Sequence, residues 1–259
     1  MLIEVESLEE PYSVVVAVDE GLVNRFKPAL PFESVAVAWK QEVYLSTPIK
    51  LELSNEELDA RVAKGFAYYW PPERSLCLFY GVTHAYTPVA RVGVIVDPVQ
   101  RVPGLAGEFR EQCGVRVKEH VIDEGLKDVV GMLGSRGYLV ATPLDDGVRV
   151  VTACKLMDVY PYRSAVTIYV EDYGAHVEGE ALGIFSNSLG DVALLNVMAE
   201  AVRRCSRHYA RLDLTEEGYV AVTAGVGSLS ELAEAVDEVT QAQACAYREL
   251  LRVPLKRVT

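Results

Sequence analysis

Three stretches of the sequence decide the fold of the N-terminal part of the chain: LPFESVAVAWKQEVYLSTPI at residues 30–49, FAYYWPPERSLCLFYG at residues 66–81 and TPVARVGVIV at residues 87–96. Each is rich in β-branched and aromatic residues, which favour strands. Lys40 and Gln41 form the expected turn between two strands, and Pro71 with Pro72 interrupts strand pairing because proline has no amide hydrogen. Many short strands with few helices predict a small barrel, since closure removes exposed strand edges.

The same stretches resemble a prokaryotic family of cyclophilin-like barrels whose biochemical role is not established. The resemblance covers roughly residues 1–110 and is carried, in order, by PFES at 31–34, EVY at 42–44, YWPP at 69–72, LCLF at 76–79 and PV at 88–89. Glu73 stands where that family often has glycine, so the turn is expected to differ in shape. The resemblance implies a barrel fold and does not imply a reaction.

A change in composition follows Val96. The segment DPVQRVPGLAG at residues 97–107 is typical of a linker because of its prolines and glycines. We therefore predict two domains, an all-β cyclophilin-like barrel with a short helix at residues 1–104 and an α+β domain at residues 105–259. We also expect few apolar contacts between their two cores.

The second half follows a different pattern, in which helices cover one face of an antiparallel sheet. Val166, Ile168 and Val170 alternate with polar or amphipathic residues, which predicts a strand with one buried and one solvated face. Helices are expected at 124–133, 188–209 and 229–251, and strands at 137–142, 148–154, 165–171, 176–182, 211–214 and 219–224. This order resembles the type III secretion chaperone-like fold, including the YbjN-like family, most specifically at residues 214–239. That resemblance implies a binding or interaction module.

Composition excludes several classes of protein. The chain has 259 residues and a net charge of −12, which argues against a nucleic-acid binder. No apolar run approaches the roughly 20 residues that a membrane-spanning helix needs. The acidic N-terminus argues against export, and five scattered cysteines without CxxC spacing predict reduced thiols in a cytoplasm.

Catalytic and metal-binding motifs are not evident in the sequence. Four isolated histidines give no zinc spacing, so we predict no metal and no cofactor. Cys77 lies in an apolar strand and is interpreted as a small core residue. Cyclophilins accelerate prolyl isomerisation with an arginine in a Phe-His-Arg context, which this sequence lacks; Arg91 is the one barrel-strand arginine in a comparable setting.

The aromatic residues of the barrel strands indicate where a ligand would bind. Tyrosine and tryptophan combine an apolar body with a polar tip, and a few polar groups among such residues make a typical small-molecule site. Barrels are also filled by such residues, so core packing is the alternative for each of them. We predict a ligand-binding cleft formed by Glu42, Tyr44, Tyr69, Phe79 and Arg91, with Arg91 holding an anionic or carbonyl-bearing ligand.

Two functions from different classes stay open at this point. The first is a non-catalytic binding or interaction protein with a small molecule or peptide in the barrel cleft. The second is an enzyme, either a weak peptidyl-prolyl isomerase or an amide-hydrolase-related subunit, and a strongly perturbed carboxylate or thiol in the cleft would favour it. The broad apolar surfaces of the C-terminal helices, which include Leu194 and Val197, also predict a homo-oligomer. We expect no nucleic-acid or membrane partner.

Overall fold

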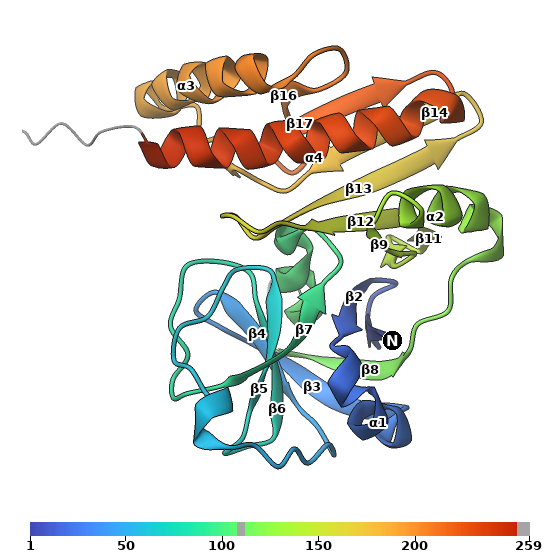
Figure 1. The fold of residues 1–259 in the computed structure, drawn as a ribbon, viewed down its shortest axis with the longest axis vertical. Coiled ribbons are helices and arrows are strands. Elements are labelled where there is room, and N and C mark those ends of the chain that lie inside the picture. The colour runs from blue at the N-terminus through green and yellow to red at the C-terminus, as the bar shows by residue number, and fades with distance from the viewer. Residues whose placement is uncertain (108–111, 253–259) are drawn as a thin grey trace, which may run out of the picture.

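The protein is described by a computed structural model that covers residues 1–107 and 112–252. Eight antiparallel strands form a closed barrel in the order β1-β2-β7-β5-β6-β4-β3-β8, as the lower half of Figure 1 shows. Their bounds are β1 Leu2–Ser7, β2 Ser13–Val18, β3 Phe32–Trp39, β4 Glu42–Ser46, β5 Phe66–Trp70, β6 Ser75–Phe79, β7 Ala90–Ile95 and β8 Gln112–Glu119. The predicted short helix is α1, Val23–Phe26. The predicted barrel is thus confirmed.

Alternate residues of the strands fill the barrel interior. The interior cluster includes Val5, Leu45, Tyr69 and Leu78, all almost completely buried. The 3₁₀ helix Val99–Ala106 adds Val102 and Leu105 to the same cluster. Burying a side chain such as valine or leucine contributes about 1.5–3 kcal/mol each, so this interior is the main source of stability of the barrel.

The barrel continues beyond the predicted linker. Strand β8 pairs with β1 and β3, so the barrel reaches Glu119 and the boundary that we placed between residues 104 and 105 falls within it. The linker residues themselves form the 3₁₀ helix that packs on the barrel interior. Whether the two parts of the chain fold independently stays a prediction.

The second half is an antiparallel sheet covered by helices, as predicted. The sheet runs β15-β17-β14-β13-β12-β9, with β16 paired to β17. Its strands are β9 Leu139–Ala141, β12 Val151–Leu156, β13 Arg163–Glu171, β14 Gly174–Gly179, β15 Gly183–Ile184, β16 Arg211–Leu214 and β17 Tyr219–Val226, and β10 Leu144–Asp145 pairs with β11 Val148–Arg149 in a separate hairpin. The helices are α2 Lys127–Gly134, α3 Leu189–Cys205 and α4 Leu229–Arg252. Together with the barrel, these elements confirm the predicted fold class.

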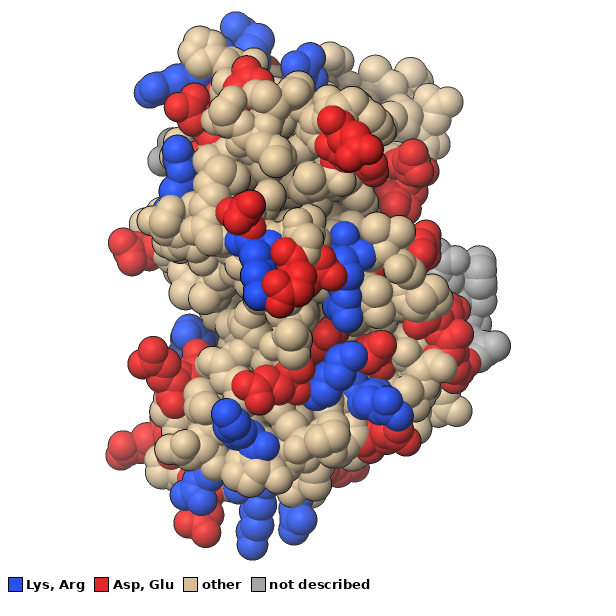
Figure 2. All heavy atoms as spheres, turned by 90° about the vertical axis from the view of Figure 1, so that its right-hand side faces the viewer, with Lys and Arg blue, Asp and Glu red and all other residues tan. Residues whose placement is uncertain are grey.

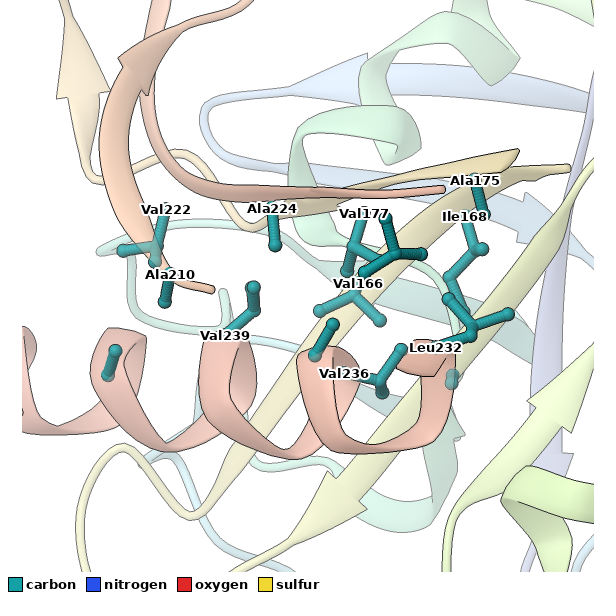
Figure 3. Close-up of a cluster of buried hydrophobic side chains, with 14 of the residues drawn as sticks. Val166, Ile168, Ala175, Val177, Ala210, Val222, Ala224, Leu232, Val236 and Val239 are labelled. Carbon is teal, nitrogen blue, oxygen red and sulfur yellow. The ribbon is translucent and has the colours of Figure 1, made fainter. Parts of the chain in front are cut away.

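The core of this second part lies between the sheet and the helices. Figure 3 shows Leu232, Val236 and Val239 of α4 directed at sheet residues that include Val166 and Ile168. Leu232, Val236 and Val239 recur at three- and four-residue steps and are fully buried, so they form the face of α4 that packs on the sheet. In Figure 1, α3 and α4 lie on the side of the sheet that is turned away from the barrel.

The opposite face of the sheet packs on the outer wall of the barrel. Ala141, Cys154 and Ala165 share one buried cluster with barrel residues that include Tyr68 and Phe79. The expectation of few apolar contacts between the two cores was therefore wrong, as was that of a solvated second face along the whole of β13. The residues on that face are small, which lets the barrel wall approach the sheet closely.

Buried charged residues also interact across the junction between the barrel and the second part of the chain. Arg163, which is 1% exposed, pairs with Glu180 and donates from Nη2 to the carbonyl of Asp97 at 2.8 Å. The Asp97 carboxylate accepts from Val15 N at 2.7 Å and from Arg101 Nε at 3.1 Å. Truncating one member of such a pair costs about 3–5 kcal/mol, because it leaves the other charge buried and uncompensated. The Arg163 hydrogen bond to Asp97 and an ion pair of 2.8 Å between Arg101 and Asp145 cross the junction, so the two parts are not held together by apolar contact alone.

The cysteines differ in part from the prediction. Cys205 of α3 and Cys245 of α4 form a disulfide, so the expectation that all five thiols are reduced was wrong for this pair. Cys77, Cys113 and Cys154 are free and buried. No sequence spacing indicated the pairing, because the two cysteines are 40 residues apart and meet only when the two helices pack.

Candidate functional site

A pocket opens on the outer wall of the barrel, across β3, β4, β6 and β5. It has a volume of about 230 Å³ and a mainly apolar lining. The lining residues are Trp39, Glu42, Tyr44, Trp70, Glu73, Cys77, Phe79, Ala85, Tyr86 and Val89. Three of the five predicted site residues, Glu42, Tyr44 and Phe79, are among them.

Strand pairing explains why residues far apart in sequence share this pocket. Trp39 and Glu42 are register partners across the turn at Lys40 and Gln41, and Glu42 is also the register partner of Phe79 on β6. Register partners project from the same side of a sheet. Because successive residues of a strand alternate, Glu42 and Tyr44 face outward while Val43 and Leu45 belong to the barrel interior.

Three aromatic rings form one wall of the pocket. The Tyr86 ring is nearly perpendicular to those of Trp39 and Trp70, with centroid distances of 6.2 and 6.3 Å. Trp70 Nε1 donates to Thr87 Oγ1 at 2.7 Å, which fixes the indole and ties the segment that carries Tyr86 to β5. The ring contacts and this hydrogen bond together hold the wall in place.

The Glu42 carboxyl is the distinctive polar group of the pocket. Glu42 is 6% exposed, and its Oε2 atom is buried without a hydrogen-bond partner. Burial raises the pKa of this carboxyl to about 7, against an opposing effect of the nearby Lys40 ammonium. Near neutral pH the site therefore holds an ionisable group poised between its two forms.

Cys77 lies opposite Tyr44 in the register and lines the same pocket. Burial raises the pKa of its thiol well above the usual range, and the Glu42 carboxylate adds to this effect. A thiol becomes a strong nucleophile when its pKa is lowered, and here the shift is in the opposite direction. The arrangement agrees with the interpretation of Cys77 as a small packing residue.

Two predicted site residues lie elsewhere. Tyr69 faces the barrel interior, where its hydroxyl donates to the carbonyl of Ile49 at 3.0 Å. Arg91 lines a separate hollow at the junction with the sheet, lies over the Phe66 ring and has an ion pair with Asp19 at 3.7 Å. The structure therefore does not bring the five residues into one cleft.

Sequence reasoning missed several lining residues, among them Trp39, Trp70 and Tyr86. Trp39 could have been found from the two-residue turn, which sets it opposite Glu42. Trp70 could have been found by alternation, because it follows the inward-facing Tyr69 and must face outward. Tyr86 lies in an irregular segment without periodicity, so no signal in the sequence points to it.

The rest of the described surface has other features. A groove of about 840 Å³ on the open part of the second sheet is lined by acidic side chains, including Glu178 and Glu217. In residues 1–107 and 112–252 there is no group of three or more His, Cys, Asp or Glu side chains placed to hold a metal ion. No helix within those ranges is both long and apolar enough to cross a bilayer. On the face in Figure 2, acidic and basic side chains are interspersed and form no continuous basic patch.

Comparison with known proteins agrees with the barrel. A family model described as cyclophilin-like matches residues 3–110. The N-terminal part of this chain is similar to the cyclophilin-like family. This family has no established function, and a search of curated proteins found no match.

Solved structures similar to part of the chain were also found. The chain is similar to the solution structure of the hypothetical protein AF2241 from Archaeoglobus fulgidus, with 25% identity over 46% of this chain and 94% of that one, at a TM-score of 0.36. It is also similar to the structure of McbB in complex with tryptophan, with 18% identity over 52% of this chain and 54% of that one, at a TM-score of 0.35. The chain thus spans about half the length of the second protein.

Proposed function

We propose that the protein binds a small organic ligand, or a single side chain of a peptide, in the pocket on the outer wall of the barrel. The observation that carries the proposal is the buried Glu42 carboxyl with its unpartnered Oε2 atom. Leaving a buried polar group unsatisfied costs about 1–3 kcal/mol, so a carboxyl that faces a pocket in this state is ready to accept a complementary donor. The pocket volume of about 230 Å³ favours a small occupant.

An enzyme that transfers protons is the second candidate, and the same carboxyl is the observation that favours it. A pKa of about 7 suits a general acid or base at neutral pH. Among the residues that line the pocket there is no histidine, lysine or arginine to assist it, and the Cys77 thiol is not activated. Arg91, on which the isomerase alternative depends, lies in a different hollow. These points favour binding over catalysis.

Tryptophan fluorescence tests the proposal directly, because the chain has two tryptophans and both line the pocket. We expect that a screen of small amines, acids, amides and alcohols finds at least one compound that changes this fluorescence. Ala85→Leu, which fills the pocket, should abolish the response. Val82→Leu is the matched control, since Val82 is 95% exposed and lies in the same segment outside the pocket.

Arg91→Ala should keep the response, because Arg91 does not line this pocket. Absence of any response across the four compound classes, or a response that survives Ala85→Leu, would contradict the proposal. If the second candidate is right, NMR will show that wild type converts the compound it binds into a product. Glu42→Gln should then bind the compound without converting it.

Self-association and a cytoplasmic location stay proposals. The outer face of α3 supports self-association, because Leu189 is 91%, Leu194 45% and Val197 44% exposed. Light scattering over a range of concentrations checks this, and a 28.5 kDa particle throughout would count against it.

A further inference from the structure

The aromatic wall of the pocket is suited to a cation. Trp39, Trp70 and Tyr86 meet edge to face, at interplanar angles of 81° and 82°, and all three line the pocket. The faces of such rings carry partial negative charge and attract ammonium groups, most strongly in the case of tryptophan. The Trp39 ring already does so, because the ammonium of Lys40 lies 4.2 Å from its centroid.

The charges of the lining side chains have one sign. Glu42 and Glu73 both line the pocket, and Glu73 is exposed to solvent. No lysine or arginine is among the lining residues. A buried carboxylate in an apolar wall gains most from a partner of opposite charge that also donates a hydrogen bond. Anionic ligands would be repelled by both carboxylates, and neutral ligands would leave the Glu42 charge uncompensated.

We infer that the occupant is a protonated organic amine that keeps at least one N–H. This inference rests on the proposed function and names its ligand class. The aromatic wall packs against the alkyl groups on the nitrogen, and the N–H donates to Glu42 Oε2, the atom without a hydrogen-bond partner. A quaternary ammonium would satisfy the rings but not this acceptor. Protonated secondary and tertiary amines satisfy both the rings and the acceptor, because they carry further alkyl groups on the nitrogen and keep at least one N–H.

Lys40 is the competing cation of the chain itself. Its ammonium lies over Trp39 and influences the Glu42 carboxyl through space, yet Glu42 Oε2 has no hydrogen bond from it. A bound amine would therefore add a contact that Lys40 does not make. Removing the Lys40 charge should strengthen amine binding, because it removes repulsion between two cations near one carboxylate.

The experiment compares three probes of similar shape by NMR titration at pH 8: N,N-dimethylbutylamine, N,N,N-trimethylbutylammonium and the neutral N,N-dimethylbutanamide. We expect the tertiary amine to bind at least ten-fold more tightly than either of the others. Glu42→Gln should weaken amine binding at least ten-fold and leave amide binding unchanged. Lys40→Met should tighten amine binding a few-fold, and Arg91→Ala is the control that should not alter it.

Equal affinity for the amide or for the quaternary ion would overturn the inference, as would retention of amine binding in Glu42→Gln. Such a result would leave the proposed function intact, provided that Ala85→Leu still abolishes the binding. If none of the three probes binds while an acid or alcohol from the fluorescence screen does, the ligand class is wrong and the pocket is right. If nothing binds in either experiment, both proposals fail.

Discussion

Two buried glutamates of the same barrel differ in nearly every respect. Glu4 of β1 accepts hydrogen bonds from Ser13 Oγ at 2.7 Å and Arg149 Nη1 at 2.6 Å, and lies 3.2 Å from His120 Nδ1. Burial alone would raise its pKa, but these bonds outweigh burial and lower the pKa to about 2. Glu42 of β4 is also buried, but its Oε2 atom has no such partner. Burial therefore raises its pKa to about 7.

The surroundings of Glu4 are built from both halves of the chain. His120 Nε2 accepts from the amide of Thr142 at 3.0 Å, so its Nδ1 carries the proton and donates to Glu4. Arg149 follows in the second half and donates to the same carboxylate. Glu4 is therefore a structural carboxylate at the junction of barrel and sheet. Glu42 has no such partner at its Oε2 atom, which is why we propose that it takes part in ligand binding.

The largest expected difference is in the effect of removing each charge. Glu4→Gln should lower the free energy of unfolding by about 3 kcal/mol at pH 8, because it breaks a hydrogen-bonded buried ion pair. Glu42→Gln should leave stability unchanged or raise it, because it removes an ionised group without a partner. Urea denaturation of both variants and wild type measures this. Equal losses would show that Glu42 is also structural.

The two glutamates should also give stability opposite dependences on pH. The folded-state pKa of Glu42 is above the ordinary 4.5, so the folded state binds the extra proton and Glu42 costs stability as pH rises from 4.5 to about 7. The folded-state pKa of Glu4 is below 4.5, so its contribution is complete above 4.5 and is lost as pH falls toward 2.

Each of these effects amounts to at most about 3.5 kcal/mol, at roughly 1.4 kcal/mol per pKa unit. Unfolding free energies of wild type and Glu42→Gln, measured from pH 4 to pH 8, should therefore diverge with rising pH in favour of the variant. Parallel curves would contradict the raised pKa. For Glu4→Gln the series must extend to about pH 2, because the deficit of this variant should persist at pH 4 and disappear only as pH falls toward 2.

A smaller difference is expected between two tyrosines on the two sides of the barrel wall. Tyr69→Phe removes the buried hydrogen bond to the carbonyl of Ile49 and should cost about 1 kcal/mol. Tyr44→Phe, on the outer face, should change stability by less than about 0.5 kcal/mol. Thermal unfolding of the two variants checks this. A loss that is larger for Tyr44→Phe would reverse the assignment of interior and exterior.

The contrast between these tyrosines also shows which features of the fold can be predicted from the sequence. Strands and helices were predictable because β-branched runs and apolar periodicity are local signals. The inward direction of Tyr69 and the outward direction of Trp70 follow from alternation, but which phase faces the interior depends on pairing with distant strands. Strand β8 was not predicted, because its place in the barrel depends on pairing with β1 and β3, which lie about a hundred residues away in the sequence.

The site was predictable in part for the same reason. Glu42, Tyr44 and Phe79 line the proposed pocket, and they could be grouped from the sequence because they lie on strands of evident type. Arg91 does not line the proposed pocket, because the barrel order β4-β6-β5-β7 places it two strands away from Phe79. That order is set by pairing between strands that are distant in sequence, and no local sequence pattern indicates it. The C-terminal resemblance to a secretion chaperone-like fold stays a prediction.

The pKa of Glu42 is the most direct test of this account. Side-chain carboxyl chemical shifts followed by NMR from pH 3 to pH 9, with Glu42→Gln for assignment, measure it in the intact chain. The account predicts a midpoint of about 7 for Glu42, whereas Glu4, whose pKa is about 2, should remain largely ionised throughout this range. A Glu42 midpoint at or below the ordinary value of 4.5 would mean that this carboxyl already has a partner, and the proposed binding site would lose its basis.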